Sequence, residues 1–247
     1  MIMKPIVLLG AAVYTRDAEP GKDYDWYVKM GDIQLFKTME EIHRLALRDA
    51  NGEVPKIAVM IEKQRIGFLI ADMPSQRLDH SNRVIYDTFY LEFDISYQRS
   101  VLHAAAILLL CSRNDYHEAE KHFTEYAERL FYNWQAPQLI LDTVKLPIVD
   151  KQPDLSLTWV EPDKLALSSN SVNQNRCARY LINFNAQPDN NFVFISTGRI
   201  NLKKCQQVAD KIEKCLLLTT SSEVLTEIKL KKGTLYTLSK MIKLTKY

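Results

Sequence analysis

One stretch of this chain, residues 63–95, limits the possible folds more than any other, because two long apolar segments enclose a short polar loop. In the second segment, from Val84 to Ile95, apolar and polar residues alternate, and a period of two is that of a β-strand. The first segment, residues 65–73, is equally apolar. We therefore predict a long β-hairpin with one buried face and a polar loop at residues 74–83.

Asp87 is the one residue that breaks this alternation, because it places a carboxylate among the apolar residues of the strand. A buried carboxylate is costly unless it is paired or hydrogen-bonded. The loop offers two arginines, Arg77 and Arg83, as partners. We predict that an arginine of the loop pairs with Asp87.

The remaining elements are of mixed type. Apolar segments predict further strands at residues 5–14, 23–30, 56–61, 155–159, 192–197 and 223–229. Helical spacing predicts helices at residues 38–50, 97–113, 115–130, 177–182 and 202–215. Capping boxes predict that two of these helices start at Thr38 and at Asp115.

This mixed order predicts an α+β fold, with a mixed α/β fold as the alternative. The expected core is a mixed or antiparallel sheet that contains the long hairpin and is packed by a helical hairpin. Prolines at positions 137 and 147 suggest a boundary, which gives an N-terminal region at residues 1–134 and a βα-type C-terminal region at residues 150–247. One continuous domain is the alternative.

The four cysteines are scattered, with no Cys-x-x-Cys pair and no cluster with histidine. This usage predicts buried, reduced thiols and a cytoplasmic protein. No apolar segment approaches the roughly 20 residues that span a bilayer, so we expect neither a transmembrane segment nor peripheral membrane contact. His117 and His122 lie five residues apart, about 140° around a helix, so no metal site is predicted, and no cofactor motif is present.

The polar loop is the best candidate for a catalytic site. His80 would act as acid or base, Asp79 would orient it, Arg83 would assist catalysis, and Arg77 would bind an anion. A purely structural hairpin loop is the alternative reading, because Asp, Ser and Asn are favoured in turns. The pattern Arg77-x-Asp79-x-x-x-Arg83 resembles proteins of uncharacterised bacterial operons, and this resemblance implies no particular function.

The C-terminal end is basic, since residues 201–247 contain ten lysines and four acidic residues, a balance of +6. A basic end that also carries apolar residues is typical of a surface that meets phosphates or an acidic partner, and a solvated helix is the alternative. The lysines that would bind such a partner are Lys229, Lys231, Lys232, Lys240 and Lys243.

Without a catalytic motif, the sequence favours a non-enzymatic interaction or regulatory protein that acts with a protein partner. Two alternatives remain open. The first is an enzyme that acts on nucleic acid or a phosphate ester through residues 77–83. The second is a module that binds nucleic acid or an anionic surface through the lysine-rich C-terminus.

Overall fold

The computed structural model describes residues 2–17, 22–27, 30–48, 55–133, 143–148, 164–184, 191–210, 214–224, 227–231 and 234–237. The strands in these ranges are β1 (Ile2–Val7), β2 (Gly10–Thr15), β3 (Asp25–Tyr27), β4 (Ile57–Glu62), β5 (Arg65–Leu78), β6 (Val84–Asp94), β7 (Thr143–Ile148), β8 (Lys164–Ser168), β9 (Phe192–Thr197), β10 (Lys214–Thr219), β11 (Glu227–Lys231) and β12 (Thr234–Thr237). The helices are α1 (Ile33–Ile42), the π-helix η1 (His43–Leu47), the 3₁₀-helix η2 (Ile95–Tyr97), α2 (Gln98–Leu110), α3 (Arg113–Tyr132), α4 (Ser171–Asn183) and α5 (Leu202–Ala209).

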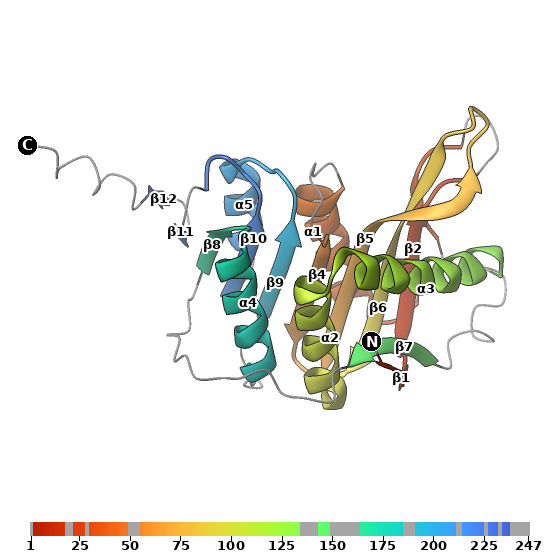
Figure 1. Ribbon diagram of the computed structural model, residues 1–247, viewed down its shortest axis with the longest axis horizontal. Coiled ribbons are helices and arrows are strands. Elements are labelled where there is room, and N and C mark those ends of the chain that lie inside the picture. The colour runs from red at the N-terminus through yellow and green to blue at the C-terminus, as the bar shows by residue number, and fades with distance from the viewer. Residues whose placement is uncertain are drawn as a thin grey trace, which may run out of the picture.

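A mixed sheet forms the centre of the molecule (Figure 1). Within the described ranges it has ten strands in the order β12-β11-β8-β10-β9-β4-β5-β6-β2-β3, and β1 and β7 form a separate antiparallel pair. The strands from β9 through β4, β5, β6 and β2 to β3 pair antiparallel, whereas β8, β10 and β9 are parallel and are connected through α4 and α5. The predicted α+β fold is confirmed.

The sheet runs through both predicted regions, because β4 of the first pairs with β9 of the second in the register Ile57↔Ser196 to Ile61↔Phe192. The parallel strands β8, β9 and β10 all end on the side of the sheet where β4 begins.

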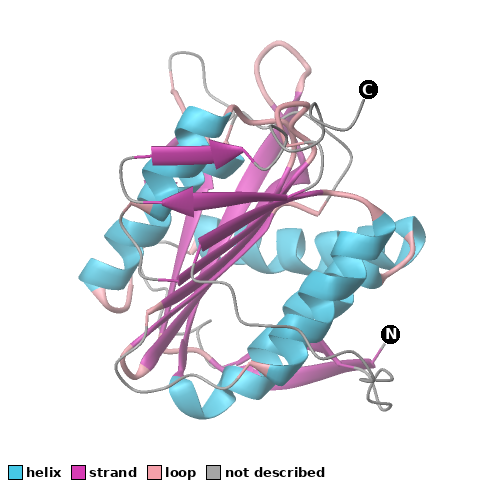
Figure 2. Ribbon diagram, turned by 90° about the vertical axis from the view of Figure 1, so that its left-hand side faces the viewer, coloured by secondary structure: helices cyan, strands magenta, loops and turns pink. Residues whose placement is uncertain are grey.

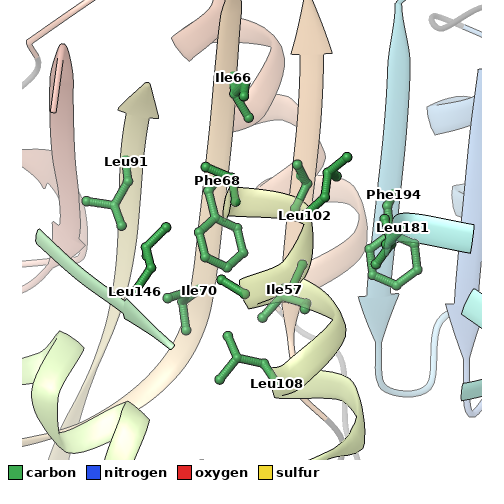
Figure 3. Close-up of a cluster of buried hydrophobic side chains, with 14 of the residues drawn as sticks. Ile57, Ile66, Phe68, Ile70, Leu91, Leu102, Leu108, Leu146, Leu181 and Phe194 are labelled. Atoms are coloured by element: carbon green, nitrogen blue, oxygen red, sulfur yellow. The ribbon is translucent and has the colours of Figure 1, made fainter. Parts of the chain in front are cut away.

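Helices cover both faces of the sheet (Figure 2). On one face, α2, α3, α4 and the β1–β7 pair bury a core that includes Phe68, Leu91 and Phe194, shown in Figure 3. On the other face, α1, η1 and α5 bury a second core around Met39, Tyr90 and their neighbours. Apolar side chains therefore line both faces of the central strands.

This second core corrects the prediction for the hairpin, which expected only one buried face. Tyr90 and Glu92 lie on the supposedly polar face of β6, and both are fully buried. The reason is that the second face is covered too: Phe36 of α1 packs against Tyr90, and Arg65 donates to Glu92 over 2.8 Å. The distal part of the β5–β6 hairpin projects beyond the rest of the sheet (Figure 1).

Several predicted boundaries were wrong for local reasons. The strand predicted at residues 5–14 is two strands, β1 and β2, which belong to different sheets. The first long helix begins earlier than predicted, because Asp32, and not Thr38, caps it by accepting from the amides of Gln34 and Leu35. Ser112 likewise caps α3 in place of Asp115.

Three further outcomes concern the second half of the chain. The helix expected at residues 202–215 ends at Ala209, and residues 214–219 form strand β10 instead. The helix considered as an alternative for the basic end is absent at residues 234–237, which form strand β12. The strand predicted at residues 155–159 lies outside the described residues.

All four cysteines lie in described segments and all are free, as predicted: Cys111 is half-buried, and Cys177, Cys205 and Cys215 are buried. Among the described residues, no helix is both long and apolar enough to cross a membrane.

Candidate functional site

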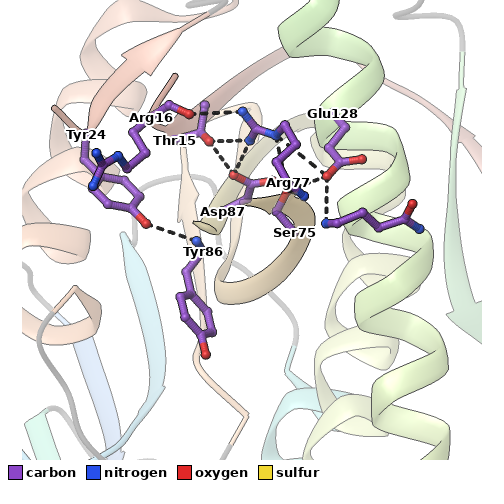
Figure 4. Close-up of polar contacts among 9 residues, drawn as sticks. Thr15, Arg16, Tyr24, Ser75, Arg77, Tyr86, Asp87 and Glu128 are labelled. Carbon is purple, nitrogen blue, oxygen red and sulfur yellow. Dashed lines mark hydrogen bonds and ion pairs between the residues drawn. The ribbon is translucent and has the colours of Figure 1, made fainter. Parts of the chain in front are cut away.

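The first candidate region is the polar part of the hairpin, where Arg77 pairs with Asp87 as predicted (Figure 4). The Arg77 Nη2 atom lies 2.8 Å from Asp87 Oδ1, and the Thr15 hydroxyl donates to the same oxygen. Burial raises the pKa of Asp87, while the charge of Arg77 opposes that rise. The carboxylate is fully buried, so Arg77 is its essential partner.

Arg77 also ties the hairpin to its neighbours. It donates to the backbone carbonyl of Arg16 over 3.0 Å, and its guanidinium lies 4.6 Å from the ring centroid of Phe131 on α3. Glu128 of α3 accepts from the Ser75 hydroxyl and lies 3.8 Å from Arg77 Nε. We call the group formed by Thr15, Ser75, Arg77, Asp87 and Glu128 the Arg77 cluster.

The tip of the hairpin contains the predicted catalytic residues. Asp79 is buried and accepts from the backbone amides of Ser81 over 2.8 Å and Arg83 over 3.0 Å, and from Arg83 Nε over 2.9 Å. The hydrogen bond from the Arg83 backbone is the main cause that lowers the pKa of Asp79 to about 2. Asp79 thus closes the turn.

His80 lies exposed at this tip, and within the described ranges it makes no hydrogen bond to Asp79 or Arg83. The structure therefore brings Asp79 and Arg83 together but leaves His80 apart from them. Arg77 pairs with Asp87, 10 residues further along the chain. The catalytic and anion-binding roles proposed for these four residues stay predictions.

Two of the predicted lysines lie near the opposite edge of the sheet. Lys229 and Lys231 belong to β11, which pairs with β8 and β12, while Lys232, Lys240 and Lys243 lie outside the described residues. Their proposed role in binding also stays a prediction.

A different site is a cavity of about 940 Å³, which lies where the sheet ends beside the first residues of β4. Its wall is built from nine segments, from β2 to the first turns of α4. The lining residues are Tyr14, Tyr24, His43, Arg48, Pro55, Lys56, Ala71, Asp72, Pro74, Tyr86, Thr88, Leu109, Cys111, Arg113, Tyr116, His117, Glu120 and Gln174. Pockets of roughly 300–1,000 Å³ are typical of small-molecule sites.

The π-helix η1 forms one wall of the cavity. The amide of Arg48 donates to the carbonyl of His43 over 2.8 Å, an i→i+5 bond. In an α-helix, residues five apart are separated by about 140°, whereas the wider π turn brings them toward one side. This local widening allows both His43 and Arg48 to line the cavity.

The floor of the cavity is an irregular part of β5. The pairing register between β5 and β6 shifts between Ile70 and Met73, and Asp72 within this shift has a φ of 58°. An aspartate tolerates this left-handed conformation better than most residues do. The bulge directs Asp72 to Lys56, with which it forms an ion pair.

His43 is a buried polar group in this wall. Its Nε2 atom lies 3.1 Å from the Thr88 hydroxyl, and its ring meets that of Tyr14 at a centroid distance of 4.6 Å. Burial, followed by the nearby charge of Arg48, lowers the pKa of His43 to about 3. His43 is therefore neutral near pH 7 and serves as a hydrogen-bonding group.

The opposite wall is the first part of α3. His117 Nδ1 lies 2.8 Å from a carboxylate oxygen of Glu120, and burial raises the pKa of Glu120. Burial also raises the pKa of the Tyr116 phenol, so this hydroxyl is neutral. Arg113 completes this wall with a second guanidinium.

Arg48 differs from the other cations of the cavity. Its guanidinium lies 5.6 Å from the ring centroid of Tyr14, and no carboxylate in the described part of the chain lies within ion-pair distance of it. Lys56, by contrast, already pairs with Asp72. Arg48 is therefore the cation best placed to receive an anionic group from a ligand.

Sequence reasoning missed this cavity because its residues are far apart, from Tyr14 to Gln174, and none belongs to a recognisable motif. A local signal is His43, a histidine within the helix predicted at residues 38–50. In the described ranges, no group of His, Cys, Asp or Glu has the arrangement of a metal site. Comparisons with protein-family models, with curated proteins and with solved structures gave no match.

Proposed function

We propose that this protein binds a small anionic molecule in the cavity and acts as a ligand-responsive regulatory protein. The observation that carries the proposal is the presence of three cationic side chains, Arg48, Lys56 and Arg113, from three separate segments around one cavity of about 940 Å³. The two acidic side chains of the wall, Asp72 and Glu120, leave a positive balance.

The irregular backbone supports the same site. A π-helix and a residue in the left-handed conformation both occur in the cavity wall, at His43–Leu47 and at Asp72. Such departures from regular structure are uncommon and tend to accompany functional sites. The cavity also lies beside the start of β4, where Ile57 pairs antiparallel with Ser196 of β9.

A regulatory role fits better than catalysis, because the buried side chain best suited to acid–base chemistry is held neutral. Burial and the charge of Arg48 lower the pKa of His43 to about 3, so its ring is neutral near pH 7. A regulatory protein that binds a ligand acts by changing its contact with another molecule. The protein partner that the sequence predicts is therefore part of this proposal.

Thermal unfolding with a panel of small anions tests the proposal. Inorganic phosphate, citrate, aromatic carboxylates and nucleotides would each be added, with neutral analogues of similar size. A ligand present at a concentration about 100 times its dissociation constant stabilises the folded state by about 2.7 kcal/mol. At least one anion should raise the Tm of the wild type and fail to raise that of Arg48→Glu.

Arg44→Glu is the matched control, because Arg44 also belongs to η1 but is exposed and does not line the cavity. This variant should keep the response of the wild type. The proposal is wrong if no anion raises the Tm, or if Arg48→Glu and Arg44→Glu respond alike.

A further inference from the structure

We propose that the anionic ligand is a nucleoside monophosphate, with its base against Tyr86 and its phosphate at Arg48. This inference rests on the proposed function and specifies the ligand class. Three properties of the cavity support it: an aromatic ring with an open face, acidic groups that receive hydroxyl donors, and a modest positive charge.

The aromatic ring is that of Tyr86, which lines the cavity and is 49% exposed. Its ring points away from the Arg77 cluster (Figure 4), and no other aromatic ring of the described residues stacks on it. The Tyr86 backbone is fixed, because its amide donates to the hydroxyl of Tyr24 over 3.0 Å. A ring with an open face on a fixed backbone is suited to stacking with a planar base.

The acidic groups limit the ligand further. Asp72 and Glu120 both face the cavity. A ligand that carries phosphate groups along its whole length would therefore place negative charge beside two carboxyl groups. A ligand with hydroxyl donors between its ring and its phosphate would instead give these groups hydrogen bonds, as acidic side chains do with ribose.

The charge balance sets the number of phosphates. Arg48, Lys56 and Arg113 oppose Asp72 and Glu120, and Lys56 is already paired with Asp72. These five side chains leave a balance of +1, which suits one phosphate group better than three.

Isothermal titration calorimetry on the full chain tests the inference with AMP, GMP, CMP and UMP as probes. Adenosine, ribose 5-phosphate and ATP would be titrated in parallel. At least one monophosphate should bind tenfold or more tightly than its nucleoside, than ribose 5-phosphate and than ATP. Arg48→Glu and Tyr86→Ala should each weaken it about tenfold or more.

Two variants act as controls. Tyr86→Phe keeps the ring and the backbone contact, so it should bind as the wild type does. Tyr132→Ala removes a tyrosine that is 65% exposed and lies outside the cavity, and it should also leave affinity unchanged.

The outcomes separate this inference from the proposed function. If other anions raise the Tm through Arg48 but no monophosphate binds, the ligand class is wrong and the anion site stands. Equal affinity for ribose 5-phosphate, or unchanged binding by Tyr86→Ala, also overturns the role of the base. If no anion of either set binds, both proposals fall.

Discussion

The Arg77 cluster and the cavity lie close together in the fold but differ in how their polar groups are satisfied. In the cluster, Arg77 and Asp87 are bound to each other and to neighbouring groups from three strands and a helix. In the cavity wall, the guanidinium of Arg48 lies over the face of Tyr14 and has no carboxylate within ion-pair distance among the described residues. Charged groups that satisfy one another stabilise a fold, whereas a charge without a carboxylate partner beside a cavity is available to a ligand.

The largest effect expected from this difference concerns stability. Arg77→Met leaves Asp87 buried without its cation, and breaking a buried pair costs about 3–5 kcal/mol. Urea denaturation should show a loss of that size. Arg83→Met, which removes an arginine whose side chain is 68% exposed, should cost less than about 1 kcal/mol. Similar losses in the two variants would show that the Arg77 cluster is not a stabilising centre.

The second prediction concerns the pH dependence of stability through His43. The unfolded chain binds a proton on this residue below pH 6.5, whereas the folded chain does so only near pH 3. Acid therefore favours unfolding, and the stability that the neutral ring contributes is lost as the pH falls from 6.5 toward 3. His43→Gln should remove a slope of about 1.4 kcal/mol per pH unit from that range.

Urea denaturation of both proteins at several pH values across this range measures that slope. The other histidines are common to both proteins, so they cancel in the difference. Parallel curves for the wild type and His43→Gln would contradict the burial of a neutral His43.

The third prediction separates stability from binding. Because Arg48 is exposed and lacks a carboxylate partner in the described chain, Arg48→Glu should change the free energy of unfolding by no more than about 0.5 kcal/mol. The same variant should lose tenfold or more in affinity for the bound anion. A large loss of stability in chemical denaturation would instead show that Arg48 stabilises the fold, which is the role we give to Arg77.

The smallest effect is expected at His80. This exposed residue contacts neither Asp79 nor Arg83, so His80→Ala should leave both stability and anion affinity within error of the wild type. Assays of the variant with RNA, DNA and phosphate esters would examine the alternative hypothesis. If the wild type turns over one of these substrates and His80→Ala abolishes that turnover, the loop is an active site. That result would overturn the interpretation of the loop as a purely structural turn.

The hairpin and the ion pair between Arg77 and Asp87 could be predicted because the information is local. Alternation from Val84 to Ile95 identifies the strand, and a carboxylate that breaks it requires a nearby cation. The strand predicted at residues 23–30 is confirmed in its middle, since residues 25–27 form β3. The second buried face of the hairpin could not be predicted, because it depends on α1, which packs there from another part of the chain.

The cavity could not be predicted for the same reason. It depends on a π-turn inside a segment whose apolar spacing fits a continuous helix, and on a bulge at Asp72 that no glycine marks. The C-terminal half shows a related ambiguity: Cys215 fits the spacing of the preceding helix, but it belongs to β10, which pairs with β8 and β9.

The most direct test of the account is a crystal structure with the anion of the panel that raises the Tm most. We predict electron density for this anion inside the cavity, in contact with the guanidinium of Arg48. Density beside His80 at the tip of the hairpin, or at any site away from Arg48, would contradict the account.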